Sequence, residues 1–154
     1  MAKKICSLVL LVFWMACIFA FSAQPAEEST KLSDSVKEKV IEIVERVFPS
    51  VAEKAAKPDG ETTLIKIIRK SAHFFAYLIL GVLAMWTFSA YGIKKRYGLA
   101  FLLCVLYAIS DEIHQAFVPG RACRLFDVCI DTAGAALGLF AVFLIKKRKK
   151  CLTK

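Results

Sequence analysis

The sequence predicts an all-α integral membrane protein with four transmembrane helices and an amphipathic helix in the first outer loop. Hydrophobic residues make up 58% of the 154 residues, and the mean hydropathy of +0.57 lies well above that of typical soluble domains. Four apolar segments occur at about residues 5–21, 71–90, 97–117 and 128–145. Each falls within the range of roughly 17–25 residues that crosses a bilayer as a helix. We therefore expect residues 1–154 to form a single membrane domain.

The first segment, residues 5–21, has two interpretations. Lys3 and Lys4 before the apolar run and Ala20-Phe21-Ser22 after it are compatible with a secretory signal peptide. The run is longer than the usual h-region of about 7–15 residues, which favours an uncleaved helix. Cleavage would leave the topology of the other three segments unchanged.

The expected outer loop, residues 22–70, has a helical pattern of its own. Apolar residues recur at helical spacing between Ser35 and Phe48, Ser35 and Glu38 fit a capping box, and Pro49 ends the run. The charges of this run nearly cancel, so it lacks the basic face of helices that bind lipid headgroups. We expect an amphipathic helix that packs on the bundle.

The orientation follows from the basic residues, which membrane proteins retain on the cytoplasmic side. Every Asp and Glu falls within the two other loops, about residues 22–71 and 110–131. Both termini are therefore expected to be cytoplasmic. The net charge of +9 is then a topology signal that also attracts anionic lipid, and a nucleic-acid partner is excluded. The basic clusters are Lys3-Lys4, Lys94-Lys95-Arg96 and, at the start of a cytoplasmic tail over residues 146–154, Lys146-Lys147-Arg148-Lys149-Lys150.

The six cysteines do not form a disulfide scaffold. Cys6, Cys17 and Cys104 lie within predicted helices, and Cys151 follows the last helix on the reducing side. Only Cys123 and Cys129 could form a disulfide with each other. Most of the six cysteines are expected to be small apolar thiols packed among other side chains.

The third apolar segment ends in polar residues at a depth where it should still be crossing lipid. Ionisable residues at membrane depth cost on the order of 2.5–3.5 kcal/mol on insertion scales and are usually paired, inward-facing and functional. The stretch from Ser110 to Arg121 is therefore the first candidate for a site.

Two further polar sets lie at the outer ends of their helices and are expected to converge with this stretch. Positions four residues apart lie on one helix face, and Gly134 and Gly138 form a small-xxx-small pattern for close helix packing. We call the converging set the outer polar cluster. Its members are Arg69, Lys70, His73, Tyr77, Asp111, Glu112, His114, Gln115, Arg121, Asp127 and Asp131.

Several interpretations of this cluster stay open. Four cations there, with Arg124 included, balance four carboxylates, which favours a salt-bridge network over a metal site with excess negative charge. No HExxH motif is present in the sequence, so no metal or other cofactor is expected. Arg121, just after a Pro-Gly turn, is the best candidate to bind an anion. His73 or His114 as a general base is a weaker alternative.

These motifs resemble the signature of VanZ-like membrane proteins, and the resemblance covers nearly the whole chain, including Phe21-Ser22-x-Gln24-Pro25. The family often has Asn at the position of Asp131. The three blocks that carry it are Arg69-Lys70-x-x-His73-Phe74-x-x-Tyr77-x-x-Leu80-Gly81, Ser110-Asp111-Glu112-x-His114-Gln115-x-Phe117-Val118-Pro119-Gly120-Arg121 and Asp127-Val128-x-x-Asp131-x-x-Gly134-x-x-x-Gly138.

The resemblance implies a multi-pass protein of the bacterial cytoplasmic membrane with its polar motif facing outward. The founding member is linked to low-level resistance to the glycopeptide teicoplanin. Two function classes follow for this chain. One is a protein that binds an anionic lipid or a lipid-linked cell-wall precursor, or otherwise modulates the envelope. The other is a membrane-embedded hydrolase or transferase acting on a lipid-linked phosphate. A transporter is a third option. A purely structural assembly factor held by Gly134 and Gly138 is a further alternative, and homo-oligomerisation stays open.

Overall fold

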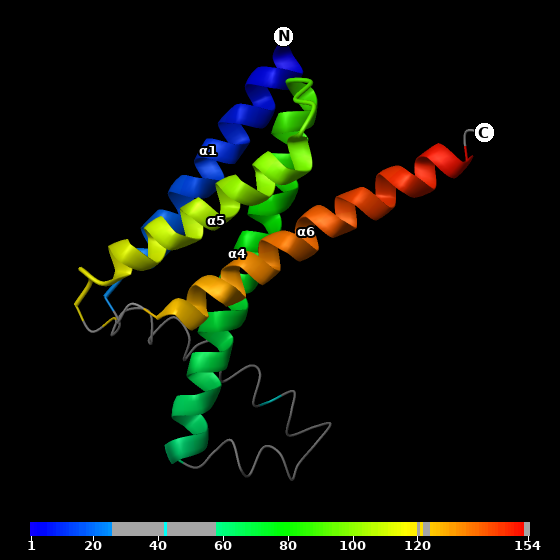
Figure 1. The fold of residues 1–154 in the computed structure, drawn as a ribbon. Coiled ribbons are helices and arrows are strands. Elements are labelled where there is room, and N and C mark those ends of the chain that lie inside the picture. The colour runs from blue at the N-terminus through cyan, green and yellow to red at the C-terminus, as the bar shows by residue number, and fades with distance from the viewer. Residues whose placement is uncertain (26–41, 43–57, 120, 122–123, 153–154) are drawn as a thin grey trace.

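The computed structural model describes residues 1–25, 42, 58–119, 121 and 124–152, and these contain four long α-helices. They are α1 (Ala2–Ser22), α4 (Pro58–Ala90), α5 (Arg96–Gln115) and α6 (Leu125–Leu152) (Figure 1). All four are long and apolar enough to cross a membrane. The predicted all-α membrane class is confirmed, and no strand occurs in the described ranges. The amphipathic helix expected over residues 35–48 lies outside the described residues.

The helices extend further than the apolar segments that predicted them. α4 begins at Pro58, so the last part of the expected outer loop 22–70 is helical, and only Ile67–Ala90 is apolar enough to span. Pro is well suited to the first position of a helix because its missing N–H needs no partner there. α5 ends at Gln115, and α6 continues through the basic residues to Leu152. Hydropathy marks the part of a helix that crosses lipid, whereas backbone hydrogen bonding continues into polar sequence.

α4 is the central helix and packs against α1, α5 and α6. Its closest approach is to α6, where the backbones meet without intervening side chains. A Cβ added at Gly134 would press against the carbonyl oxygen of Phe74, and one at Gly138 against that of Leu78. Gly81 faces Ala135 in the same way from the other helix. This is the small-residue packing that holds helices together in lipid, where the hydrophobic effect is lost.

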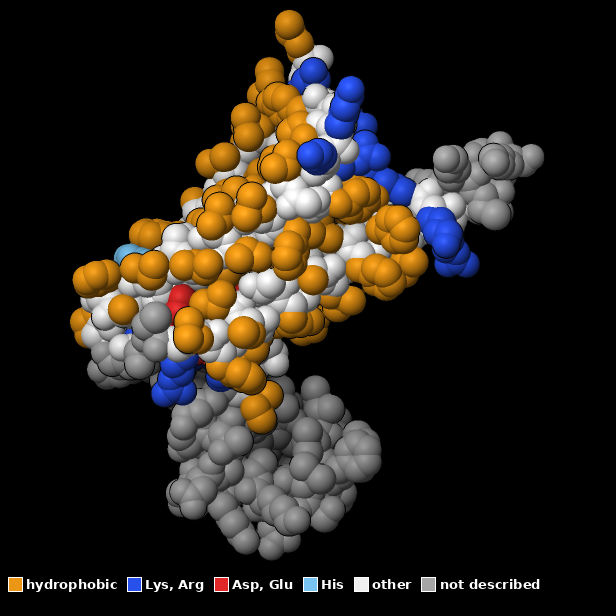
Figure 2. Space-filling model, viewed as in Figure 1, with side chains coloured by type: hydrophobic (Ala, Val, Ile, Leu, Met, Phe, Trp, Pro, Cys, Tyr) orange, Lys and Arg blue, Asp and Glu red, His pale blue; other side chains and the backbone are white. Residues whose placement is uncertain are grey.

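The bundle has a small core and a large apolar exterior. Tyr77, Leu80, Met85 and Cys104 are fully buried where the helices meet. Large hydrophobic side chains are exposed on every helix, and they cover the flanks of the bundle in Figure 2. In a soluble protein such a surface would aggregate, whereas in a bilayer it faces acyl chains.

Polar side chains within the bundle donate across helices to backbone carbonyl oxygens. Trp14 Nε1 donates to Ala76 O at 2.9 Å, and Tyr107 Oη donates to Met15 O at 2.6 Å. Thr87 Oγ1 donates to Ser7 O at 3.0 Å. Since lipid offers no hydrogen-bond partners, these contacts both satisfy the donors and fix α1 against α4 and α5.

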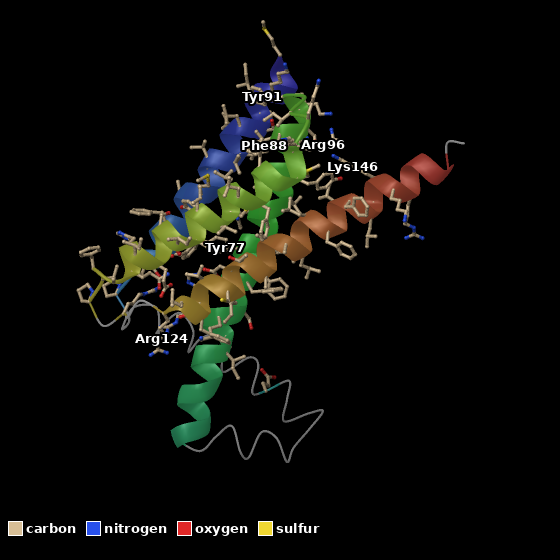
Figure 3. The ribbon with its side chains drawn as sticks, in the orientation of Figure 1. Tyr77, Phe88, Tyr91, Arg96, Arg124 and Lys146 are labelled. Carbon is tan, nitrogen blue, oxygen red and sulfur yellow. The ribbon has the colours of Figure 1, made fainter. Side chains whose placement is uncertain are left out.

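The two ends of the bundle differ in charge. At the basic end, Lys4 lies over the ring of Tyr91, which joins the start of α1 to the α4–α5 turn. Lys146 of α6 donates to Ser89 in the last turn of α4. Tyr91, Arg96 and Lys146 lie towards this end in Figure 3, and Arg124 lies towards the other. We call that other end, where α1 and α5 finish and α6 begins, the cluster end.

Candidate functional site

The cluster end brings most of the outer polar cluster together from three helices. Arg69, Lys70 and His73 come from α4, Asp111, Glu112 and Gln115 from the last turns of α5, and Asp127 and Asp131 from the first turns of α6. Lys70 Nζ lies 2.5 Å from Asp127 Oδ1 and also over the ring of Phe126. This pair ties α4 to the start of α6.

Asp111 anchors a chain of hydrogen bonds that ends at Arg121. Ser22 Oγ donates to Asp111 Oδ2 at 2.8 Å, and Gln115 Nε2 donates to the same oxygen at 3.2 Å. The other end of that amide, Gln115 Oε1, accepts from Arg121 Nη1 at 3.2 Å, and Arg121 Nη2 donates to Phe21 O at 3.4 Å. Arg121 is therefore positioned by an amide and a carbonyl, with no carboxylate bonded to it among the described residues.

Glu112 holds the segment between α5 and α6. Its carboxylate accepts the backbone N–H of Arg124, and the carbonyl of Arg124 accepts the N–H of Asp127 as α6 begins. Glu112 is only 3% exposed. Its negative charge lies near the first N–H groups of α6, where a helix dipole favours an anion.

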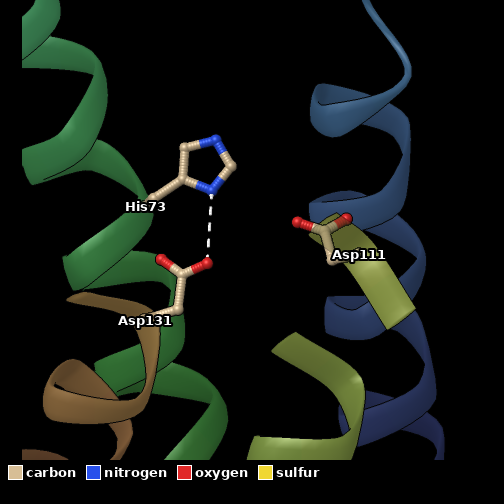
Figure 4. Close-up of side chains that lie close together, drawn as sticks. All are labelled: His73, Asp111 and Asp131. Atoms are coloured by element: carbon tan, nitrogen blue, oxygen red, sulfur yellow. Dashed lines mark ion pairs between the residues drawn. The ribbon is translucent and has the colours of Figure 1, made fainter. Parts of the chain in front are cut away.

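His73, Asp111 and Asp131 form a compact trio between α4, α5 and α6 (Figure 4). His73 Nδ1 lies 3.9 Å from Asp131 Oδ2, and one donor atom from each of the three residues lies within 4.8 Å of the others. Asp111 and Asp131 are each 2% exposed. One oxygen of each, Oδ1, has no hydrogen-bond partner in the described structure.

Two cavities meet at this end of the bundle. A polar cavity of about 90 Å³ is lined by basic and acidic side chains from α4, α5 and α6, including Lys70, Glu112 and Asp127. A larger, mostly apolar groove of about 460 Å³ lies between α1 and α4, and Arg69, His73 and Arg121 line both spaces. The apolar wall of the groove includes Trp14, Ile18, Phe21, Phe75, Ala76 and Ile79.

Comparison with known protein families matches residues 7–146 to VanZ/LLP1. The chain belongs to the VanZ/LLP1 family. The resemblance predicted from the motifs is thereby confirmed. A curated relative is an uncharacterized protein of Schizosaccharomyces pombe, 28% identical over 86 residues that cover 55% of this chain and 52% of the relative. The chain thus matches about half of that relative's length. No solved structure matches the chain.

Three candidates in this VanZ/LLP1 chain line neither cavity, namely Asp111, which belongs to the trio, His114 and Tyr77. His114 stacks on Phe19 of α1 with ring centroids 4.3 Å apart, and its Nε2 atom is buried without a described partner. Tyr77 is fully buried in the core, beside the ring of Tyr107. His114 lies on α5 but faces Phe19 of α1. Tyr77 lies on the same face of α4 as His73, one turn deeper, and is buried inside the bundle rather than in the space that His73 and Arg121 share.

The cluster end of this chain also involves residues of α1 that the sequence did not single out as site residues. Ser22 is fully buried against Asp111, and Trp14 and Phe21 line the apolar groove. Ser22 and Phe21 fall in the Phe21-Ser22-x-Gln24-Pro25 block of the family resemblance, which was the available signal. Cys129 is a free, exposed thiol, and Cys123 lies outside the described residues.

The charges of the cluster balance in number but not in position. Lys70 pairs with Asp127, whereas the carboxylates of Asp111 and Asp131 have no Lys or Arg within ion-pair distance among the described residues. Burial lowers the pKa of the Arg121 guanidinium from its ordinary value. Desolvation disfavours the charged form, so an anion that approached Arg121 would relieve that penalty.

Proposed function

We propose that this VanZ/LLP1 membrane protein binds an amphiphile with an anionic headgroup, either an anionic phospholipid or a lipid-linked cell-wall precursor. Its apolar chain would occupy the groove between α1 and α4, and its headgroup would contact Arg69 and Arg121. The observation that carries this proposal is the shared lining: one apolar groove ends at two guanidinium groups that also face the polar cavity.

The hydrogen bonding of the two arginines supports this assignment, because neither is bonded to a carboxylate among the described residues. Arg121 is held by Gln115 and Phe21, and its Nε atom has no described partner. Arg69 makes no described hydrogen bond or ion pair and lines both spaces. A guanidinium suits phosphate or carboxylate because its donors form a planar fork. Two such groups at the mouth of an apolar groove match a charged headgroup on a long chain.

The location of this site is part of the proposal. The basic end would face the cytoplasm of a bacterial cell, with both termini on that side, because Lys and Arg are retained there. The cluster end would then face the cell exterior. Lipid-linked wall precursors are used on that face, and a glycopeptide such as teicoplanin would meet the same surface.

The direct test is lipid retention by the purified protein. Full-length protein and an Arg69→Gln/Arg121→Gln variant would be extracted in mild detergent, and bound phosphatidylglycerol and polyprenyl phosphates measured by mass spectrometry. Removing two charge-assisted contacts, each worth about 1.5–3 kcal/mol, should reduce retention at least about 100-fold. Arg148→Gln, an exposed residue at the basic end, is the matched control. Equal retention by all three proteins would contradict the proposal.

A second candidate is a membrane-embedded hydrolase or transferase acting on a lipid-linked phosphate. The trio of His73, Asp111 and Asp131 beside the arginines favours it, since such groups can activate water or a hydroxyl near a bound phosphate. Asp131→Asn is the discriminating variant, because it removes the charge of one carboxylate of the trio and leaves Arg69 and Arg121, which would bind the headgroup, unchanged. Phosphate release that this change abolishes while lipid retention persists would establish the enzyme class.

We extend the binding proposal to envelope protection as a separate claim. Binding of a lipid-linked precursor at the outer face would alter its access to teicoplanin. Expression in a sensitive host, with the membrane abundance of each variant measured in parallel, tests this claim. Protection by the parent and its loss in Arg121→Ala at equal abundance is the expected result, while a parent without effect would restrict the proposal to lipid binding.

A further inference from the structure

We propose that His73, Asp111 and Asp131 bind a divalent transition-metal cation of the Zn²⁺ type between α4, α5 and α6. The proposal goes beyond the lipid-binding function and does not depend on it. One imidazole nitrogen and two carboxylates are a donor set that zinc accepts, with a further position left for water or a ligand.

The geometry of the trio fits a site that contracts slightly on binding. One donor atom from each residue lies within 4.8 Å of the others, and His73 Nδ1 is 3.9 Å from Asp131 Oδ2. Ligands about 2.0–2.2 Å from a tetrahedral zinc lie roughly 3.3–3.6 Å apart. A side-chain movement of about 1 Å closes that difference, and Figure 4 shows the Asp111 carboxylate across the gap from His73 and Asp131.

The burial of the two carboxylates is a second observation that supports a cation at this position. Asp111 and Asp131 are each only 2% exposed. The Oδ1 atom of each has no hydrogen-bond partner among the described residues. A buried carboxylate oxygen without a partner is disfavoured, and two buried carboxylates close together also repel each other. A metal ion would satisfy the free oxygens and compensate both charges.

None of the cations near the trio bonds to its carboxylates among the described residues, and Arg69 makes no described hydrogen bond or ion pair. Lys70 pairs with Asp127, and Arg121 donates to Gln115 and Phe21. Asp131 has only His73 as an ion-pair partner within the part of the chain that the structure describes. The protein therefore places cations around these two carboxylates without bonding any of them to the free oxygens.

Asp111 is also oriented as metal ligands usually are. Ser22 Oγ and Gln115 Nε2 both donate to its Oδ2 atom, which leaves Oδ1 for another partner. Such outer hydrogen bonds fix a ligating carboxylate, and their loss typically lowers metal affinity about 10–100-fold. If the proposed function holds, the metal would also add positive charge beside Arg69 and Arg121, where the headgroup would bind.

A proton shared by Asp111 and Asp131 would relieve the same repulsion and is the competing explanation. The test uses the full chain, purified in detergent without a histidine tag, stripped with a chelator and titrated with Zn²⁺ and Co²⁺. We expect about one metal per chain and a cobalt d–d spectrum without a thiolate charge-transfer band. His73→Gln, Asp111→Asn and Asp131→Asn should each abolish that spectrum, and Ser22→Ala should weaken binding about 10–100-fold.

His114→Ala and Cys129→Ser are the controls and should retain full binding, because His114 lies against Phe19 and Cys129 is exposed outside the trio. Metal-free unfolding curves establish that the ligand variants fold. Absence of stoichiometric metal in the parent, or equal binding by the parent and all three ligand variants, would overturn the proposal. Metal binding with no lipid retention would overturn only the lipid-binding function. Lipid retention with no metal binding would overturn only the metal site.

Discussion

At the scale of single residues, position rather than composition decides the character of the cluster. The cluster contains four cations and four carboxylates when Arg124 is included. This equal count predicts a charge-neutral network. In the structure, Arg121 reaches an amide and a carbonyl instead, and Asp111 and Asp131 keep free oxygens. Counting charges could not reveal this, because the outcome depends on side-chain distances of a few ångströms between different helices.

The role of Ser22 gives the first prediction. Its hydroxyl donates to the buried Asp111 carboxylate at 2.8 Å, so Ser22→Ala leaves that acceptor with one fewer donor. We expect a loss of about 1–3 kcal/mol in the free energy of unfolding, measured by denaturant titration in mixed micelles. Ser110→Ala is the control, because that exposed hydroxyl donates only to Tyr107 O in its own helix. An equal effect of both changes would contradict the role assigned to Ser22.

The two histidines show the limit of reading a site from residue type. His73 and His114 were both candidates, and they lie on neighbouring helices, α4 and α5. Only His73 joins the carboxylates, while His114 stacks on Phe19. Spacing along one helix gives the face on which a residue lies, but which neighbour that face meets depends on how the helices rotate against each other.

At the scale of helices, the sequence predicts the four spans well and their ends poorly. Apolar runs and the Gly134/Gly138 spacing are local signals and are read directly. The start of α4 at Pro58 and the extension of α6 to Leu152 lie in polar sequence, where hydropathy gives no signal. The helix expected over residues 35–48 stays a prediction, since it lies outside the described residues.

The packing of α4 on α6 gives the second prediction. Gly134→Ala would place a methyl group against the carbonyl oxygen of Phe74, and backbone cannot move aside as a flexible side chain can. We expect destabilisation of about 1–3 kcal/mol, as for other overpacked sites, and lower membrane abundance.

Gly98→Ala is the matched control for that change. No atom lies within 4 Å of a Cβ added at Gly98, which is exposed on α5. Alanine is the better helix former by about 1 kcal/mol, so this variant should be unchanged or slightly stabilised. If Gly134→Ala were equally well tolerated, the close approach of α4 and α6 would not be what holds these helices together.

At the scale of the whole molecule, charge separates the two ends of one bundle. Lys4 over Tyr91 and Lys146 on Ser89 gather the basic residues at one end, while the carboxylates of the cluster lie at the other. This separation could be predicted, because the order of the loops and the sign of their charges are both properties of the sequence. The groove between α1 and α4 could not, since its lining comes from residues about 50 to 60 positions apart.

The third prediction concerns the orientation of that bundle. In a cysteine-free background, Arg124→Cys, between α5 and α6 at the cluster end, should react with a membrane-impermeant maleimide in intact bacterial cells. Lys94→Cys at the basic end should react only after the membrane is opened. Both positions are exposed, so accessibility reports the side of the membrane. The reverse pattern would place the outer polar cluster in the cytoplasm and remove the cell exterior from the proposed function.

The most direct test of the central claim uses Trp14, which lines the apolar groove. In nanodiscs, with Trp86→Phe to leave one reporter, brominated phosphatidylglycerol should quench Trp14 fluorescence at lower mole fraction than brominated phosphatidylcholine. Arg69→Gln/Arg121→Gln should abolish that preference, and Arg148→Gln should preserve it. Equal quenching by both lipids in the parent protein would show that the groove does not select an anionic headgroup.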